Sequence, residues 1–360
     1  MHDASPVRVQ PNACVQMRSR YAECGHCEKI CPTGALRIEE GAIDVADGCT
    51  GCGRCMAACP TGALQVRGFL QKLDIKPHIP RALHIDCARA PNDAEIRVTC
   101  LGGLPVSRLL ALRLAAGERS IALLDHGWCA TCPAAGNTKE HPAAKSLARA
   151  VARLRDAGLT EALMPKLQSV PASRPARPLR QPHAGRRRFL ARLAAPRTPA
   201  AARFTPAPAP DRELTLDILA RLCAQYGGKV SEKLYHRVEL DERCRGHAVC
   251  AAVCPTGALR LEGADGQGAG LSHSSRLCIA CGQCERVCPE KALRLERGAG
   301  HAPRRMVIDF ETRECGVCGT HMTQAAGGAI GVLCGRCEKS SLLARSAFDQ
   351  FHGALTGGSR

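Results

Sequence analysis

Aromatic residues are scarce in this chain of 360 residues, which contains 1 Trp, 3 Tyr and 6 Phe, or 3% in total. Aromatic side chains supply much of the area that ordinary protein cores bury. A single large core is therefore excluded, and we expect several small domains. Small domains with few bulky side chains need additional cross-links, such as disulfides or metals.

Long apolar runs are also absent, and none approaches the roughly 18 residues that a membrane span requires. The opening stretch, MHDASPVRVQ, has no apolar segment behind a basic start, as a secretory signal peptide would. We therefore expect a cytoplasmic protein without a membrane span. In that compartment thiols stay reduced, and clustered cysteines indicate metal sites rather than disulfides.

Acidic residues are missing from residues 162–210, which hold one lysine, nine arginines and ten prolines in a chain of formal net charge +17. This composition cannot bury apolar area and predicts an Arg/Pro-rich linker at 163–212. The stretch GRRRFLARLA at 185–194 is similar to a twin-arginine export motif, but its place within the chain favours a docking helix. Arginine runs bind phosphates, yet too few aromatics accompany them for stacking on bases, so nucleic acid is not an expected partner.

Cysteine, by contrast, is abundant, with 24 residues, and it follows a repeated pattern. The hexapeptide CPTGAL occurs at 31–36, 59–64 and 254–259, and a variant, CPEKAL, occurs at 288–293. These copies define an internal repeat of cysteine-bearing half-modules, arranged as two pairs.

The first pair contains CTGCGRCMAACP at 49–60, a complete C-x2-C-x2-C-x3-C-P motif. In this spacing three thiolates converge on one iron–sulfur cluster while the fourth binds a neighbouring cluster. The other half, residues 14–32, keeps four cysteines with a longer first loop, and LRIEEGAIDV between the halves predicts a hairpin. The region resembles the bacterial two-cluster ferredoxins. Cross-ligation predicts two sets of ligands: Cys14, Cys24, Cys27 and Cys59 for cluster 1, and Cys49, Cys52, Cys55 and Cys31 for cluster 2.

The second pair contains the complete motif CIACGQCERVCP at 278–289 and an incomplete one in DERCRGHAVCAAVCPTGAL at 241–259. Cross-ligation assigns Cys278, Cys281, Cys284 and Cys254 to cluster 4, and Cys244, Cys250 and Cys288, with His247 at the fourth position, to cluster 3. Three interpretations of His247 remain open. It could bind a [4Fe–4S] cluster, lie beside a [3Fe–4S] cluster, or be a solvated residue while water binds the fourth iron. All three predict a reduction potential that differs from those of the other clusters.

The middle of the chain, residues 82–137, alternates β-like runs with helical patterns. The runs ALHIDC, IRVTC and IALLD end at or shortly before cysteines, and apolar helical stretches follow the second and third runs. This order predicts a small parallel α/β module. Cys87, Cys100, Cys129 and Cys132 would then meet at one edge of the sheet.

The pieces IRVTCLGGL and LLDHGWCATC, with the helix and AAGE between them, resemble the delta subunit of methyl-viologen-reducing hydrogenase. That resemblance implies a [2Fe–2S] cluster at the four middle cysteines, and electron exchange with a formate dehydrogenase or hydrogenase. The last two of these cysteines are closer together in the sequence than the family pattern leads us to expect. The first part of the segment also holds fewer cysteines than in that family. A zinc site or plain buried thiols is the alternative for these four residues.

The last cysteines follow a C-x2-C-x15-C-x2-C spacing, which is typical of a zinc ribbon or a rubredoxin-like site. Zinc and a single iron both accept four thiolates in tetrahedral geometry, so the sequence predicts zinc, with iron as the alternative. The predicted ligands are Cys315, Cys318, Cys334 and Cys337.

Together these patterns predict an α+β multidomain protein. Its expected parts are a two-cluster ferredoxin-like module at 1–75, an α/β hydrogenase-delta-like module at 76–162, the linker at 163–212, a helix with a second ferredoxin-like module at 213–298, a zinc-ribbon-like element at 299–345 and a tail at 346–360.

The function that these motifs predict is electron transfer. Three or four [4Fe–4S] clusters, with a [3Fe–4S] and a [2Fe–2S] cluster as further candidates, would relay electrons between a low-potential oxidoreductase and an acceptor. No catalytic set or flavin fingerprint is apparent, which favours a carrier or subunit without its own substrate site. The alternative is an iron–sulfur and zinc accessory or redox-sensing regulatory protein that acts by binding a partner or nucleic acid.

Overall fold

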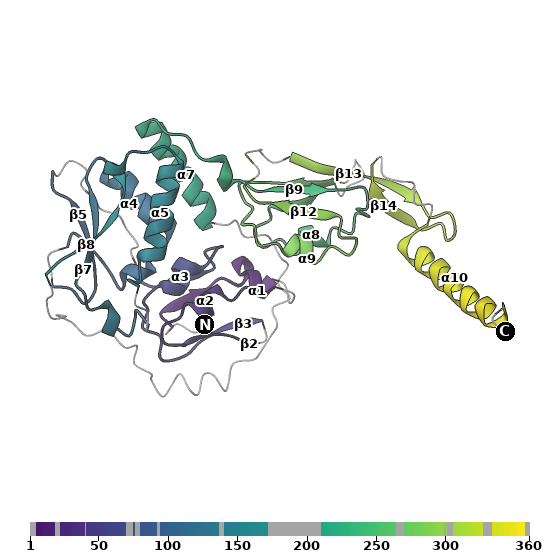
Figure 1. Cartoon of the computed structure of the whole chain (residues 1–360), viewed down its shortest axis with the longest axis horizontal. Coiled ribbons are helices and arrows are strands. Elements are labelled where there is room, and N and C mark those ends of the chain that lie inside the picture. Colours follow the sequence, from purple (N-terminus) through teal and green to yellow (C-terminus); the bar gives the residue numbers. More distant parts are fainter. Residues whose placement is uncertain are drawn as a thin grey trace.

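The computed structural model describes residues 5–18, 22–39, 41–69, 75, 80–91, 94–136, 140–171, 210–263, 270–298, 300, 305–326 and 333–356. Both helices and sheets are present, in agreement with the predicted α+β class (Figure 1). Residues 172–209, with most of the predicted linker and all of the twin-arginine-like stretch, lie outside the described residues. None of the described helices has an apolar stretch long enough to cross a bilayer.

The N-terminal unit is built from two antiparallel strand pairs. Strand β1 (Val7–Val9) pairs with β4 (Leu64–Val66), and β2 (Leu36–Glu39) forms the predicted hairpin with β3 (Ala42–Val45). Leu36 and Leu64 point inward and are almost completely buried. Short helices connect the strands: η1 (Pro11–Ala13), α1 (Val15–Arg18), α2 (His26–Lys29) and α3 (Arg54–Ala58).

The same arrangement recurs in the second ferredoxin-like unit. Strand β9 (Arg237–Leu240) pairs with β12 (Leu293–Glu296), and β10 (Leu259–Glu262) pairs with β11 (Gly270–His273). Two short helices, α8 (Val249–Ala252) and α9 (Gln283–Arg286), take the places of α2 and α3. The internal repeat in the sequence is therefore a structural repeat.

A parallel sheet lies between the two repeats in the chain, with the strand order β6-β5-β7-β8. Its strands are β5 (Leu83–Cys87), β6 (Ile96–Val98), β7 (Ile121–Asp125) and β8 (Lys166–Ser169), and all neighbouring pairs are parallel. Helices α4 (Val106–Ala116) and α5 (Ala144–Asp156) pack beside it, with the short helices η2 (Leu101–Gly103), η3 (Cys129–Thr131) and η4 (Glu161–Leu163) in the connections.

Helix α7 (Pro210–Tyr226) attaches the second ferredoxin-like unit to the parallel-sheet unit. Its Leu219 side chain is fully buried in one cluster with Leu110 of α4 and Leu154 of α5. Near its other end, the guanidinium of Arg212 donates hydrogen bonds to the carbonyls of Leu234, at 2.6 Å, and Ser275, at 3.0 Å, just before the second complete cysteine motif. The helix thus belongs to both units.

The C-terminal element extends the sheet of the second unit. Strand β13 (Arg305–Glu314) pairs with β11 and with β14 (His321–Ala325), which gives the order β10-β11-β13-β14. Helix α10 (Gly335–Thr356) then projects away from the rest of the chain (Figure 1).

The structure carries two elements across the predicted boundaries. The α/β unit does not end at 162, because Lys166–Ser169 forms the edge strand β8; its side chains are mostly exposed, so they show no apolar pattern. The predicted tail at 346–360 is helical as far as Thr356. The apolar side chains Leu342, Leu343 and Phe348 of α10 are exposed, and none of residues 335–348 is buried, so this part of the helix lacks the buried face by which helices are recognised in a sequence.

The α7 packing gives a matched test of stability. We expect Leu219→Ala to lower the free energy of unfolding by about 2–4 kcal/mol, because it opens a cavity beneath α7. Leu214→Ala on the same helix removes a side chain that is 40% exposed, and should cost less than about 1 kcal/mol. Urea unfolding of the two variants, followed by far-ultraviolet circular dichroism, measures the difference; equal losses would contradict the packing described here.

Candidate metal centres

The first predicted set of thiols lines one small cavity in the N-terminal unit. Cys14 follows η1, Cys24 and Cys27 lie at the start of α2, and Cys59 follows α3. Burial, with a smaller contribution from the other three thiols, raises the pKa of Cys27 to about 12. The longer first loop therefore still delivers Cys14 to the same cavity as its partners.

The second predicted set lines a separate cavity of the same unit. Cys49, Cys52 and Cys55 come from the complete motif, and Cys31 reaches them from the other half. Gly51 and Gly53 have φ angles of 65° and 81°, a conformation that lets the loop turn its thiols inward. Each half thus sends its last cysteine into the cavity of the other half, as cross-ligation requires.

The repeated hexapeptide CPTGAL forms the turn that holds this crossing cysteine. In its three copies the threonine hydroxyl lies 3.5–3.8 Å from the sulfur of Cys31, Cys59 or Cys254. Backbone N–H groups beyond the turn donate to Sγ at 3.2 Å for Cys59, 3.5 Å for Cys254 and 3.3 Å for Cys288. These contacts hold the crossing sulfur in a fixed position at the turn.

Glycine is the fourth residue of CPTGAL because the turn needs a positive φ angle. The angle is 62° at Gly34, 68° at Gly62 and 64° at Gly257. In the variant CPEKAL the same place is taken by Lys291, whose φ angle is 50°. The turn is therefore preserved in the fourth copy despite the side chain.

In the second ferredoxin-like unit, the complete set Cys254, Cys278, Cys281 and Cys284 lines one cavity. Burial is the main cause that raises the pKa of Cys278 to about 11, and the thiols of Cys254 and Cys281 contribute to it. Cys254 again crosses from the other half, so this set has the same construction as the second set of the N-terminal unit.

Cys244, Cys250 and Cys288 also lie close together. Burial raises the pKa of Cys250 to about 12, with a contribution from the thiols of Cys244 and Cys288. His247 lies in the same loop, but its side chain is exposed.

The backbone around His247 nevertheless has the shape of a cluster-binding loop. Gly246 and Ala248, on either side, have φ angles of 66° and 54°. Ala280 and Gly282 flank Cys281 with 53° and 73°. His247 therefore occupies the place of the second cysteine in the motif, in a loop that has kept the corresponding backbone.

The four middle cysteines surround a cavity at the carboxyl edge of the parallel sheet. Cys87 ends β5, Cys100 follows β6, and Cys129 and Cys132 follow β7. Burial is the main cause that raises the pKa of Cys100 to about 12, and the thiols of Cys52, Cys129 and Cys132 add to it. The donor set is thus four thiols in one place, which suits an iron–sulfur cluster or a metal ion.

Side chains behind Cys87 hold this edge of the sheet in place. The indole of Trp128 hydrogen-bonds to the Cys87 sulfur. Its ring stacks on His126, with centroids 4.3 Å apart and an interplanar angle of 9°. Nε2 of His126 in turn lies 2.8 Å from Oδ2 of Asp86. Neither this support nor the histidine His141, which also lines the cavity, was predicted from the sequence.

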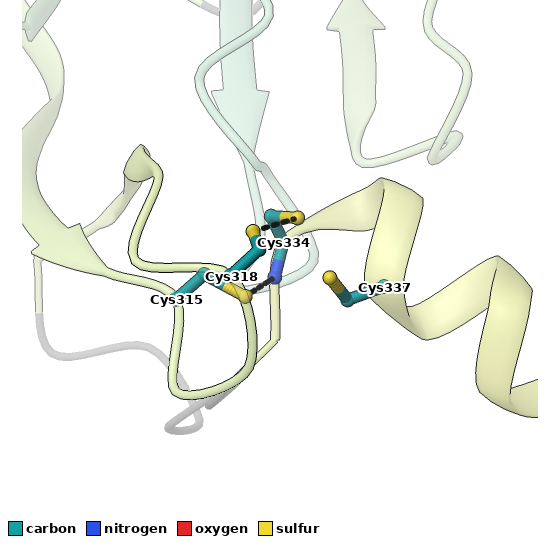
Figure 2. A group of neighbouring side chains, drawn as sticks. All are labelled: Cys315, Cys318, Cys334 and Cys337. Carbon is teal, nitrogen blue, oxygen red and sulfur yellow. Dashed lines mark hydrogen bonds between the residues drawn. The ribbon is translucent and has the colours of Figure 1, made fainter.

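The C-terminal cysteines form a tighter group, shown in Figure 2. The sulfurs of Cys315, Cys318, Cys334 and Cys337 all lie within 4.8 Å of one another, and those of Cys318 and Cys334 are 3.6 Å apart. Four ligands at about 2.3 Å from one zinc ion would be about 3.8 Å apart. Backbone N–H donors, chiefly that of Cys334 at 3.1 Å, lower the pKa of Cys315 to about 6. This geometry suits one metal ion rather than a cluster.

The cavities of the cluster-type sets are close enough for their thiols to affect one another. Beyond burial, the first influence that raises the pKa of Cys100 is Cys52 of the N-terminal unit. Burial and neighbouring thiols raise the pKa of three more cysteines, and in each case one of those thiols belongs to the adjacent set: Cys27 for Cys55, Cys24 for Cys281, and Cys250 for Cys284. The five sets therefore form one unbroken series.

Two contacts fix the junctions within this series. A Cβ atom on Gly103 would lie 2.3 Å from the carbonyl oxygen of Cys52, so only glycine allows this approach of the sheet unit to the N-terminal unit. At the junction of the two ferredoxin-like units, Arg286 and Glu23 form an ion pair at 2.9 Å beside a cavity lined by Cys24 and Cys281.

Comparison with known protein families agrees with part of these assignments. Residues 22–69 match the LdpA Fe-S cluster-binding domain, and residues 273–294 match the 4Fe-4S binding domain. These matches include all the cysteines of the two complete motifs. No curated protein matches the chain.

The chain therefore carries iron–sulfur-binding domains, which suggest an iron–sulfur electron-transfer protein. Neither match extends over the parallel-sheet unit or the C-terminal element.

The C-terminal site predicts a defined metal content. We expect Cys318→Ser to remove one zinc (or mononuclear iron) per chain and to leave the acid-labile sulfide unchanged, because this group is separate from the cluster-type cavities. Cys223→Ser, at a buried cysteine of α7 outside all the groups, is the control and should change neither. Elemental and sulfide analysis of anaerobically purified protein measures both; an unchanged metal content in Cys318→Ser would refute a metal site there.

The loop geometry at His247 leads to a second prediction. His247→Cys should complete a four-thiolate set, because the loop already has the backbone that presents Cys281. We expect a cluster-3 signal in the reduced protein that resembles those of the other cubanes, and the loss of any oxidised three-iron signal. Electron paramagnetic resonance (EPR) of the oxidised and reduced forms tests this, with His247→Ser as the control. Identical spectra for His247→Cys and His247→Ser would be the contrary result.

Proposed function

We propose that this protein is an intramolecular electron relay, in which five cysteine sets act in sequence. The observation that carries the proposal is the unbroken series of neighbouring thiol sets. It runs from the middle cysteines through the N-terminal unit and on into the second ferredoxin-like unit. A protein that only stored or sensed iron–sulfur clusters would not need each set to adjoin the next.

The thiol sets support the following cofactors within this proposal. Cubane [4Fe–4S] clusters would be held by Cys14, Cys24, Cys27 and Cys59, by Cys31, Cys49, Cys52 and Cys55, and by Cys254, Cys278, Cys281 and Cys284. Cys244, Cys250 and Cys288 would hold a fourth cluster, with either four or three irons. A [2Fe–2S] cluster belongs to the middle set, and zinc, or a single iron, to the C-terminal site. When bound, these clusters supply one-electron chemistry.

The two ends of the series are the expected points of exchange with other redox proteins. The middle site lies at one end, where Cys129 and Cys132 are only half-buried. The Cys244 set lies at the other end. The resemblance of the middle segment to a hydrogenase delta subunit favours a donor of the formate dehydrogenase or hydrogenase type at the first end. The acceptor would then dock near the second.

The junction at Gly103 tests the relay. Gly103→Ala would push the loop of Cys52 away from the middle site, because its Cβ atom would meet the Cys52 carbonyl at 2.3 Å and the ring of Phe69 at 2.7 Å. We expect the magnetic interaction between the middle cluster and cluster 2 to weaken in the reduced protein, with an unchanged iron content. EPR relaxation measurements on dithionite-reduced protein report this interaction.

Gly48→Ala is the matched control. Gly48 lies beside Cys49, and a Cβ atom there would make only an ordinary contact, at 3.8 Å from the Cβ atom of Ala35. It should behave like the unaltered protein. Little iron and much zinc in the ferredoxin-like units would refute the relay. Isolated clusters without magnetic interaction, in a protein whose binding to a macromolecule changes with redox state, would favour the regulatory alternative.

A further inference from the structure

One histidine in the middle site has no part in the ligand assignments above. His141 lies just before α5 and lines the same cavity as Cys87, Cys100, Cys129 and Cys132. One of its ring nitrogens is within 4.8 Å of both the Cys129 sulfur and a carboxylate oxygen of Asp125. Its Nε2 atom is buried and has no hydrogen-bond partner among the described residues.

We propose that His141 donates a hydrogen bond from Nε2 to the sulfur of the cluster held by the four middle cysteines, and that it thereby raises the reduction potential of that site. This inference rests on the proposed function, because it requires a cluster in the middle site. It adds a residue that sets the potential at one end of the relay.

The other ring nitrogen determines the role of Nε2. The backbone N–H of Ala143 donates to Nδ1 of His141 at 3.2 Å, so Nδ1 is an acceptor and carries no proton. In the neutral ring the proton is then on Nε2. A histidine that binds metal through Nε2 normally donates from Nδ1, which this contact prevents. The ring is therefore arranged as a donor toward the cavity and not as a ligand.

Close packing of the next residue places the His141 loop against the Cys100 loop. Pro142 follows His141 and packs against Gly102, where a Cβ atom would lie 2.7 Å from the Pro142 Cβ. Gly102 is two residues after Cys100, so the His141 loop and the Cys100 loop are fixed against each other. A donor placed this way needs no rearrangement when the cluster changes its charge.

The direction of the effect follows from charge. Reduction adds negative charge to the cluster, and a hydrogen bond to sulfur stabilises the more negative state. The carboxylate of Asp125, within 4.8 Å of the Cys129 sulfur, acts in the opposite direction, and its Oδ1 accepts the N–H of Gly127, at 2.9 Å. Nε2 of His141 makes no hydrogen bond to Asp125 or to any other described residue, so its N–H remains available to the cavity.

The test compares three variants of the full-length, anaerobically purified protein in EPR-monitored redox titrations. His141→Phe keeps a ring of similar size without the donor, His141→Gln keeps an N–H donor, and His84→Phe alters a half-buried histidine of β5 that does not line the cavity. At the midpoint potential of the unaltered protein, we expect His141→Phe to lower the ratio of reduced to oxidised middle cluster by about fivefold, the factor that one ordinary hydrogen bond gives. His141→Gln should recover part of this loss, and His84→Phe should show none.

The signal is assigned to the middle site by its disappearance in Cys132→Ser. If Cys132→Ser leaves every signal in place, no cluster occupies the middle site, and both the inference and that end of the relay are refuted. If Cys132→Ser removes the signal but His141→Phe titrates like the unaltered protein, only the role of His141 is refuted. Loss of the signal and its iron in His141→Phe would also overturn the inference, because it would make His141 a ligand.

Discussion

Burial of thiols is the constraint on which this structure depends. With so few aromatic side chains, the cores of the two ferredoxin-like units include cysteines such as Cys27, Cys55, Cys250 and Cys278. A buried thiolate without a positive partner is costly, and burial accordingly raises the pKa of these groups. Metal binding removes that cost and releases the protons, so folding and cofactor insertion are expected to be one coupled process.

Glycine has a different role at the junctions from its role in the repeats. In CPTGAL it supplies a positive φ angle for a local turn, and any copy of the repeat shows this. In the CLGG stretch after β6, Gly102 and Gly103 instead let two separate loops approach, one from each side. The glycines of the repeats and Gly102 each shape a single site, whereas Gly103 determines how closely the middle site approaches the N-terminal unit.

Much of the local structure could be predicted from the sequence. The spacing of the cysteines grouped thiols that line common cavities in the N-terminal unit and in the complete set of the second unit. The hairpin between β2 and β3 was evident from alternation, and the strand-end cysteines indicated a common sheet edge. These features depend on neighbours in the chain or on a repeated pattern. The series of sites could not be predicted, because the approach of Cys24 to Cys281 and of Gly103 to Cys52 joins segments with no shared pattern. His141 gave no signal either, since a single histidine before a helix is unremarkable until the cavity it faces is known.

The packing of α7 determines whether the chain could be divided into two proteins at its linker. The two ferredoxin-like units look like independent copies in the sequence, separated by a linker at which a gene could be divided. In space, however, α7 follows that linker and completes the hydrophobic cluster of α4 and α5, while Tyr226 hydrogen-bonds to the Gly117 carbonyl at 2.6 Å. A fragment that ended at residue 171 would leave the apolar face of α4 uncovered. The two halves are thus complementary fragments of one folding unit, and separate genes for them would encode proteins that must reassemble to be stable.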